Sequence, residues 1–323
     1  LPWRILTGSC EEYRRILSGA GLGIAPDKKA REHLTNYLQL TKPTARALNT
    51  DKTGCFNGMF VFPTETIGEA DEDVYWQSDT SHDFVYSSKG DLRQWKESIS
   101  APCAGNSRLV LALCVAFACP LLYLSGDESG GFHFRGASST GKTTALRVAA
   151  SVYGGEKYLR RWRATSNGIE SIARLHNDCF LVLDELAQVD PKEAGSISYL
   201  LANGSGKHRA HKTGVATNTA SWRLLFLSSG EISLSDHIQS EGRRSHAGQE
   251  VRLVDIPADA GLDLGIFETL PNGMSPSDFS QLLLTAAKSN FGAPGREFIK
   301  ALTKDVEGAR AKIKSFRDDF IRA

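Results

Sequence analysis

The chain has 323 residues, 41% hydrophobic and 23% charged, which is the composition of a soluble globular protein with room for two domains. The formal net charge is +1, so a globally basic nucleic-acid-binding protein is excluded, and any such contact must come from a local patch. The six cysteines form no Cys-x-x-Cys pair, which indicates reduced thiols in a cytoplasmic protein. The chain begins at Leu1 without methionine or a visible signal peptide, so a fragment of a longer protein is expected.

Residues 1–98 are predicted to form an N-terminal domain that mixes helices and strands. Leu34, Tyr37 and Leu38 lie at helical spacing, and short apolar runs follow between residues 45 and 88, broken by "TDKTG" and "GEADED". No catalytic constellation is visible in this part of the chain.

Residues 99–129 are predicted to be a helical connector. They include 16 uncharged residues from Leu109 to Leu124, a run slightly short for a membrane span and interrupted by Pro120. A buried core helix is therefore expected, and no membrane partner.

The segment "FHFRGASSTGKTT" meets every requirement of a phosphate-binding loop, Gly-x-x-x-x-Gly-Lys-Ser/Thr. The glycines let backbone N–H groups close around phosphates, the lysine reaches the β- and γ-phosphates, and the threonine hydroxyl holds Mg²⁺. A strand-like run precedes the loop, and a helix-like run ending at Gly154-Gly155 follows it, which is the context that the motif requires. ATP and Mg²⁺ are the expected cofactors, and the predicted ATP contacts are Gly136, Ala137, Ser138, Ser139, Thr140, Gly141, Lys142, Thr143 and Thr144.

The apolar run "CFLVLDEL" is predicted to be a buried parallel strand that ends in Asp184-Glu185. Carboxylates at the C-terminal end of such a strand face the phosphate loop across the sheet. Asp184 is predicted to hold Mg²⁺ together with Thr143, and Glu185 to orient or deprotonate the attacking water. A core strand that merely ends in acids is the alternative, and the complete loop weighs against it.

The segment "YLLANGSGKHRAHKTG" matches the phosphate-loop motif only in part, through "GSGKH". Leu201 stands where the first glycine is required and His208 where a hydroxyl is required, so this reading is rejected. No Asp or Glu occurs between Ala194 and Gly230, and the glycines permit a tight turn. Two interpretations of this segment are open. It is either a solvated basic surface loop or a loop that contacts DNA phosphates through Lys207, His208, Arg209 and Lys212.

The run "SWRLLFLSSGE" is predicted to be a further buried strand, ending in Ser228 and Ser229. A polar side chain there can hydrogen-bond the γ-phosphate or the water, although an ordinary strand-to-turn serine is the alternative. Downstream, Arg243, Arg244 and Arg252 are candidates for an arginine that stabilises transition-state charge in a neighbouring subunit. Each is equally compatible with a surface arginine.

Residues 258–323 are predicted to be a helical segment, still helical in character where the sequence stops, which again predicts truncation. The fold expected for residues 130–257 is α/β, a P-loop NTPase core of the AAA+ type with a mostly parallel sheet flanked by helices.

These motifs resemble domain-of-unknown-function family 927, and the resemblance covers most of the chain. It extends to "LLANGSGKHRA", "KGDLRQWKESIS" and "GNSRLVLALCVAFACPLL". That family is associated with phages, plasmids and other mobile elements, and is similar to helicase-type AAA+ ATPases, including superfamily 3. The resemblance implies a homo-oligomeric ring, with a hexamer as the expected size. It also implies ATP between subunits and single-stranded DNA in a central pore lined by the basic segment. Those helicases usually end the strand after the Asp-Glu strand in Asn, so Ser228-Ser229 makes the sensing role chemically weaker.

The expected function is an ATP-hydrolysing DNA motor, a replicative helicase of a mobile genetic element, with a primase or other replication protein as a further partner. The alternative is a AAA+ ATPase that acts on protein, or a regulatory or defence switch without unwinding. The basic, polar segment favours DNA, because a protein-threading pore usually offers an aromatic-hydrophobic-Gly loop. A small-molecule kinase is disfavoured by the Asp-Glu pair, the Ser-Ser strand end and the downstream arginines.

Overall fold

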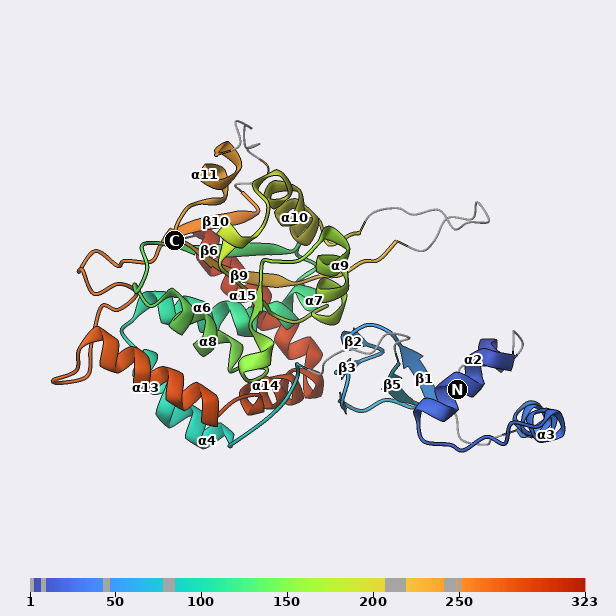
Figure 1. Cartoon of the computed structure of the whole chain (residues 1–323). Helices are drawn as coiled ribbons and strands as arrows, with labels where there is room; N and C mark the ends of the chain where they lie inside the picture. The colour runs from blue at the N-terminus through green and yellow to red at the C-terminus, as the bar shows by residue number, and fades with distance from the viewer. Residues whose placement is uncertain are drawn as a thin grey trace. The chain divides into compact units, whose positions relative to one another are not determined.

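The computed structural model describes residues 3–6, 10–42, 47–77, 85–206, 219–240, 248 and 251–322. The chain divides into two compact units, one of residues 1–49 and 71–75 and one of residues 50–70 and 76–323 (Figure 1). This division lies near residue 50 rather than at the expected residue 98. The reason is that Phe60 and Phe62 are buried in the same core as Phe134 of the main sheet.

In its described residues, the first unit holds three helices and most of a two-stranded sheet. Its small core consists of Ile5, Leu6 and Tyr13, and Asp27 caps the longest helix by accepting a hydrogen bond of 2.8 Å from the Ala30 N–H. The elements are α1 (Trp3–Leu6), α2 (Cys10–Gly19), α3 (Lys28–Leu40), β1 (Ala47–Thr50) and β5 (Asp73–Trp76).

The second unit is built on a five-stranded sheet in the order β10-β6-β9-β8-β7, with every neighbouring pair parallel. The three strands predicted around the loop, the Asp-Glu pair and the two serines are confirmed. Leu181, Val182 and Leu183 are fully buried, as expected of a parallel strand covered on both faces. The strands are β6 (Gly130–Arg135), β7 (Arg160–Arg161), β8 (Leu181–Asp184), β9 (Leu225–Gly230) and β10 (Leu253–Pro257).

Helices cover both faces of this sheet. On one face lie α6 (Ser107–Ala118) and α8 (Lys142–Ala150), and on the other α9 (Ser166–Leu175) and α10 (Pro191–Asn203) (Figure 1). The expected α/β class, with a parallel sheet flanked by helices, is therefore confirmed. α8 ends at Ala150, before the predicted Gly154-Gly155. Beyond Ala150 the backbone forms tighter turns, in which an N–H donates to the carbonyl three residues earlier. An example is the Tyr153 N–H, which donates to the Ala150 carbonyl at 3.0 Å.

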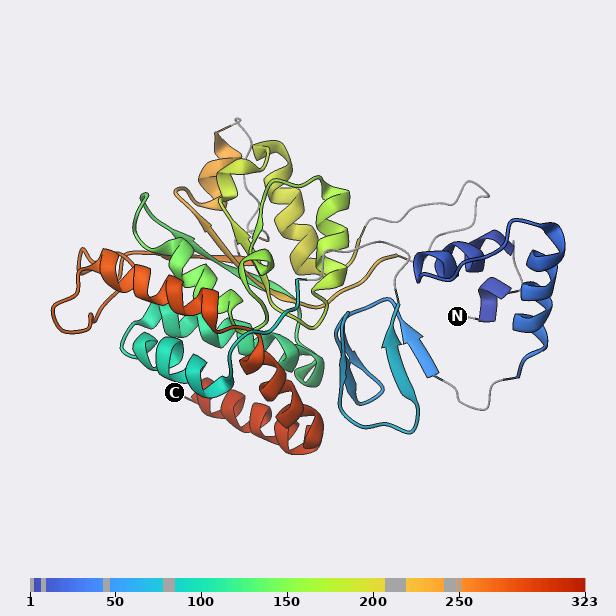
Figure 2. The same cartoon turned by 60° about the horizontal axis from the view of Figure 1, so that its bottom comes forward.

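The remaining elements of the second unit surround this framework, with the C-terminal helices on the side of α6 and α8 (Figure 2). They are the antiparallel strands β2 (Gly54–Phe56), β3 (Met59–Val61) and β4 (Thr66–Ile67), and the helical elements α4 (Leu92–Trp95), η1 (Lys96–Ser100), α5 (Ala101–Cys103), η2 (Cys119–Leu121), α7 (Leu122–Ser125), η3 (Glu156–Tyr158), η4 (Leu186–Gln188), α11 (Leu234–Gln239), α13 (Pro276–Ser289), α14 (Ala293–Lys304) and α15 (Val306–Arg322).

The apolar connector forms a packed helix. Ser107–Ser125 is long and apolar enough to cross a membrane, with a mean hydropathy of 2.0. Pro120 divides it, since the tight turn η2 separates α6 from α7. Leu109, Ala112 and Ala116 are fully buried in the main core, and α6 packs on α8 and β9. This packing is that of a core helix.

His176 lies in a buried aromatic cluster at the end of α9. Its ring centroid is 5.9 Å from that of Tyr86 and 5.3 Å from that of Tyr158. The Nδ1–H donates to the Ile172 carbonyl at 2.8 Å, and Nε2 has no partner among the described residues. Burial lowers the pKa of His176 from 6.5 to about 4.

This depressed pKa predicts an acid-sensitive fold. Below pH 6.5 His176 is protonated in the unfolded chain but stays neutral in the folded chain. The free energy of unfolding therefore decreases as pH falls from 6.5 towards 4. The loss is roughly 3 kcal/mol at its limit. Thermal melting between pH 7 and pH 4.5 checks this, and His176→Phe should flatten the profile. An equally steep profile in that variant would rule out His176 as the cause.

Candidate active site

The predicted phosphate loop joins β6 to α8 at the carboxyl edge of the sheet. The Gly136 N–H donates to the Gly230 carbonyl at 3.2 Å, which ties the start of the loop to β9. Gly141 has φ +87°, and a Cβ there would lie 2.8 Å from Cγ1 of Ile266. Glycine is therefore required at position 141 by both its backbone conformation and the available space.

Lys142 is the first residue of α8, and its ammonium lies inside the loop. Nζ donates to the carbonyls of Gly136 at 2.7 Å and Ala137 at 2.6 Å, and lies 3.3 Å from Oγ1 of Thr140. Burial lowers the pKa of Lys142, while the carboxylates of Glu231 and Asp184 act in the opposite direction. A cation at a helix N-terminus, the end of the helix dipole that favours negative charge, is suited to bind an anion such as phosphate.

The polar ends of β8 and β9 meet the start of α8. The Thr143 hydroxyl lies 3.4 Å from Oδ2 of Asp184, and the Ser229 hydroxyl donates to Oδ1 of the same carboxylate. The Glu185 N–H is 3.4 Å from the Ser229 hydroxyl. Because β9 lies between β6 and β8, Ser229 stands between the loop and the Asp184 strand. The hydroxyl and carboxylate oxygens of Thr143 and Asp184 are the donors that Mg²⁺ prefers, so these residues fit the predicted metal.

Glu185 adopts an unusual backbone conformation. Its φ of +60° lies in the left-handed region, which is uncommon for a residue other than glycine. The Glu185 carboxylate accepts a hydrogen bond from Nε2 of Gln188 in η4. The predicted water-activating group is thus exposed and held by a neighbouring amide.

The two predicted serines occupy different environments. Ser228 is fully buried, and its hydroxyl accepts from Nε1 of Trp162 at 2.8 Å. It lies 2.9 Å from Nδ1 of His133, whose Nε2 is 3.0 Å from the Ile232 carbonyl. Since Trp162 only donates and a carbonyl only accepts, the Ser228 O–H donates to Nδ1 and His133 carries its proton on Nε2. Ser228 therefore belongs to a core network, and Ser229 alone of the two contacts Asp184.

The other predicted loop residues have distinct surroundings. Ser139 has φ +64°, and the Thr140 hydroxyl donates to the Ala137 carbonyl at 2.9 Å. The Thr144 hydroxyl is 2.5 Å from that of Ser280 in α13, so this side chain is turned to the helix packing and not to the loop.

Glu231 is a site residue that was not predicted. It directly follows β9, and its carboxylate accepts a hydrogen bond from the Ser138 hydroxyl. An acid immediately after "LFLSSG" is the signal that could have drawn attention to it. Its negative charge therefore lies beside the loop, where it also acts on the Lys142 ammonium.

Arg252 lies far from the loop of its own chain. It precedes β10, which runs parallel to β6, so it is at the amino edge of the sheet whereas Gly136 is at the carboxyl edge. Its guanidinium lies 4.8 Å from the ring centroid of Tyr199, and Nη1 donates to the Gly248 carbonyl at 2.9 Å. A role in a neighbouring subunit stays a prediction. Arg243 and Arg244 lie outside the described residues, as do Lys207, His208, Arg209 and Lys212.

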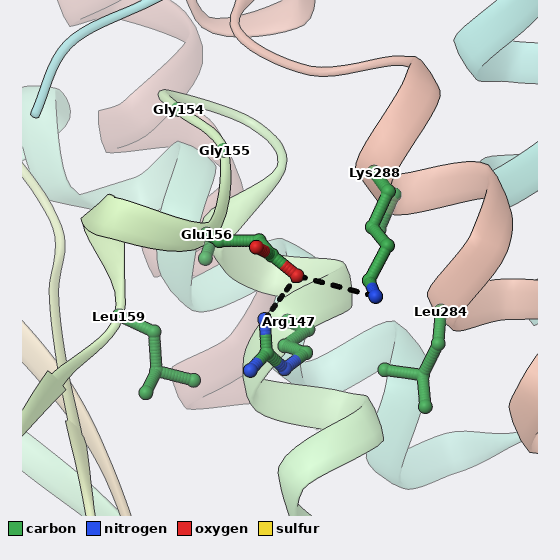
Figure 3. A pocket seen from close by; sticks show the side chains of 9 residues that line it. Arg147, Gly154, Gly155, Glu156, Leu159, Leu284 and Lys288 are labelled. Carbon is green, nitrogen blue, oxygen red and sulfur yellow. Dashed lines mark ion pairs between the residues drawn. The ribbon is translucent and has the colours of Figure 1, made fainter.

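A small cleft lies near the C-terminal end of α8, away from the loop (Figure 3). The Glu156 carboxylate lies between two cations there, 3.6 Å from Nη1 of Arg147 and 3.3 Å from Nζ of Lys288. No predicted site residue lines this cleft.

The contrast between the serines can be tested by folding stability. Ser228→Ala leaves Trp162 Nε1 and the core network without a buried partner, so it should destabilise the protein by about 1–3 kcal/mol. Ser229→Ala removes one contact of the partly exposed Asp184 and the long contact with the Glu185 N–H, so a smaller loss is expected. Urea unfolding of both variants measures the difference. Equal losses would contradict the assignment of Ser228 to the core.

Comparison with solved structures supports the fold. The structure of the active helicase Cch of SCCmec type IV matches with a TM-score of 0.68 and 20% identity, over 95% of this chain and 56% of that one. This chain thus spans little more than half of that helicase. The apo NrS-1 C-terminal region matches at a TM-score of 0.35 and 12% identity, over 84% of this chain and 62% of that one. The inhibitor-bound JCV helicase matches at a TM-score of 0.34 and 12% identity, over 72% of this chain and 61% of that one. Neither of these two weak likenesses adds to the fold argument.

No match to a curated protein was found. The model of a family described as domain of unknown function (DUF927) matches residues 1–221, which is more than half of the 323 residues. The fold and the family model agree with the resemblance of the sequence motifs. The chain therefore belongs to the DUF927 family.

Proposed function

We propose that this chain carries the motor of a AAA+-type DNA translocase that hydrolyses ATP, in a replicative helicase of a mobile genetic element. One observation carries the proposal. Lys142 lies in a glycine loop, and Thr143, Asp184 and Ser229 converge beside it at the carboxyl edge of a parallel sheet. The likeness to the Cch structure, which is described as an active helicase, supports the same function.

The geometry suits binding of a triphosphate. Lys142 would exchange the carbonyls of Gly136 and Ala137 for the β- and γ-phosphates, while backbone N–H groups of the loop surround the phosphates. Thr143 and Asp184 would hold Mg²⁺, whose charge offsets that of the phosphates when it is bound. Glu231 would give up Ser138 to make room for the phosphate oxygens.

Hydrolysis requires a positioned water. Glu185 would leave Gln188 and accept the proton of the water that attacks the γ-phosphorus, while the bond to the β-phosphate oxygen breaks. The Ser229 hydroxyl, at the tip of the strand between the loop and Asp184, would report on or orient the γ-phosphate. A serine reaches less far than the Asn of the similar helicases, so a weaker contribution is expected.

Assembly and partners complete the proposal. A homo-oligomeric ring, with a hexamer as the expected size, would bring Arg243, Arg244 or Arg252 of one subunit to the ATP of the next. Lys207, His208, Arg209 and Lys212 would contact single-stranded DNA phosphates in the pore. A cytoplasmic location and a primase or other replication partner belong to the same proposal.

The turnover of ATP with and without single-stranded DNA tests this function. Lys142→Ala should reduce turnover by about 100-fold or more, the scale of losing one preorganised group at developing charge. Combining Lys207→Ala, Arg209→Ala and Lys212→Ala should abolish the DNA-dependent increment. The logarithmic salt dependence of DNA binding should also become shallower by about 2, since each lost phosphate contact removes about 0.7.

A matched control removes three lysines from exposed positions on α14 and α15. Combining Lys300→Ala, Lys304→Ala and Lys312→Ala changes the net charge equally and should leave the DNA increment and the salt slope intact. Unchanged DNA stimulation in the first triple variant would contradict a DNA-contacting role. ATP turnover with no response of the wild type to DNA would favour a protein-acting ATPase or a switch.

A further inference from the structure

Residues 204–206 and 220–222 pair as a short antiparallel stem. In sequence they flank residues 207–218, the basic segment that carries Lys207, Arg209 and Lys212. The Gly206 N–H donates to the Ala220 carbonyl and the Trp222 N–H to the Gly204 carbonyl, both at 2.8 Å, with Ser205 opposite Ser221. Trp222 is buried, and its Nε1 donates to the Leu201 carbonyl of α10 at 3.0 Å. The described residues on the two sides of residues 207–218 are thus joined to each other by the stem.

A segment distant in sequence, Asp51–Cys55, follows β1 and includes the first two residues of β2. It contacts the stem through Lys52 and contacts Asn177 and Asp178 through its backbone. Lys52 Nζ donates to the Ser221 hydroxyl at 2.8 Å. The Thr53 carbonyl accepts from Nδ2 of Asn177 at 2.7 Å, and the Cys55 N–H donates to Oδ2 of Asp178 at 3.0 Å. We call Asp51–Cys55 the clamp segment.

A buried ion pair joins the clamp segment to the stem. Asp178 is 1% exposed, and both Nε and Nη2 of Arg223 lie 2.8 Å from its Oδ1. The backbones of the pair are also joined, since the Asp178 N–H donates to the Arg223 carbonyl at 2.6 Å. Arg223 directly follows the stem residue Trp222, so Asp178 holds the clamp segment and the stem through one carboxylate.

The same pair stands at the amino ends of the two strands that carry the candidate active site. Asp178 precedes β8, which ends in Asp184, and Arg223 precedes β9, which includes Ser229. A strand rises about 3.3 Å per residue, so six residues separate the ion pair from the site by about 20 Å. The stem is therefore connected to the Asp184–Ser229 contact by two directly paired strands.

We propose that the clamp segment is a positioning device for the basic segment, with Lys52, Asn177 and Asp178 as positioning residues. It fixes the stem, and so fixes where the basic side chains meet nucleic-acid phosphates. A pre-positioned segment loses less conformational freedom on binding than an unrestrained one, which strengthens binding without a new contact to the ligand. The nature of that ligand rests on the function proposed above; the clamp itself rests on the contacts of the described residues.

A double-mutant cycle on the Lys52–Ser221 contact tests the clamp. Lys52→Met and Ser221→Ala, at positions that are not fully buried, should each accelerate hydrogen exchange of the Gly206 and Trp222 amides by about 5-fold. Each should also raise the oligothymidylate concentration for half-maximal ATPase stimulation by about 3-fold. The double variant should match the single variants, because one contact is removed in all three. Lys52→Arg keeps a donor at this position, so its amide exchange rates and its oligothymidylate concentration for half-maximal stimulation should equal those of the wild type.

Lys300→Met is the matched control, since this exposed lysine pairs with Glu297 on α14, remote in sequence from the stem. It should leave both readouts unchanged. If neither Lys52→Met nor Ser221→Ala alters hydrogen exchange of the Gly206 and Trp222 amides, the clamp is overturned. This holds whatever the effect of oligothymidylate on ATP turnover. Faster stem exchange with an unaltered oligothymidylate dependence would overturn its role in ligand binding. If the wild type does not respond to oligothymidylate, the proposed function fails, and the exchange cycle still decides whether the clamp exists.

Discussion

The structure depends on one interaction, the placement of the Lys142 ammonium inside its own loop. Its hydrogen bonds to the Gly136 and Ala137 carbonyls hold a cation at the N-terminus of α8. Gly141 must be glycine for this geometry, because its φ is positive and Ile266 occupies the space of a side chain. Everything else in the site is arranged around this charge, including the carboxylates of Asp184 and Glu231 that face it.

The parallel sheet explains how distant residues reach that charge. All of its strands point their carboxyl ends to one edge, and β9 lies between the strands of the loop and of Asp184. A polar residue at the tip of β9 is therefore adjacent to both. At the opposite edge, the Asp178–Arg223 pair joins the beginnings of β8 and β9 to the stem of the basic segment. The proposed phosphate site and the proposed clamp therefore lie at opposite edges of the same sheet.

The sequence predicts the local parts of this arrangement well. The loop is predictable because Gly136, Gly141, Lys142 and Thr143 belong to one motif of eight residues. β8 is predictable because a buried parallel strand is a continuous apolar run. The choice between Ser228 and Ser229 is not predictable, because it depends on which face of β9 meets Trp162 and His133. Likewise, the apolar character of Phe60 and Phe62 indicates burial but not which core they join. The Asp178–Arg223 pair depends on residues 45 apart in sequence, for which no local pattern exists.

The central claim is that the loop of residues 136–143 binds the triphosphate with Mg²⁺ at Thr143 and Asp184. A crystal structure with Mg²⁺ and a non-hydrolysable ATP analogue measures it most directly. The account predicts that Lys142 Nζ leaves the Gly136 and Ala137 carbonyls for the β- and γ-phosphates, with the metal between Thr143 and Asp184. A nucleotide bound elsewhere, or a Lys142 that keeps its carbonyl contacts beside the bound nucleotide, would contradict it.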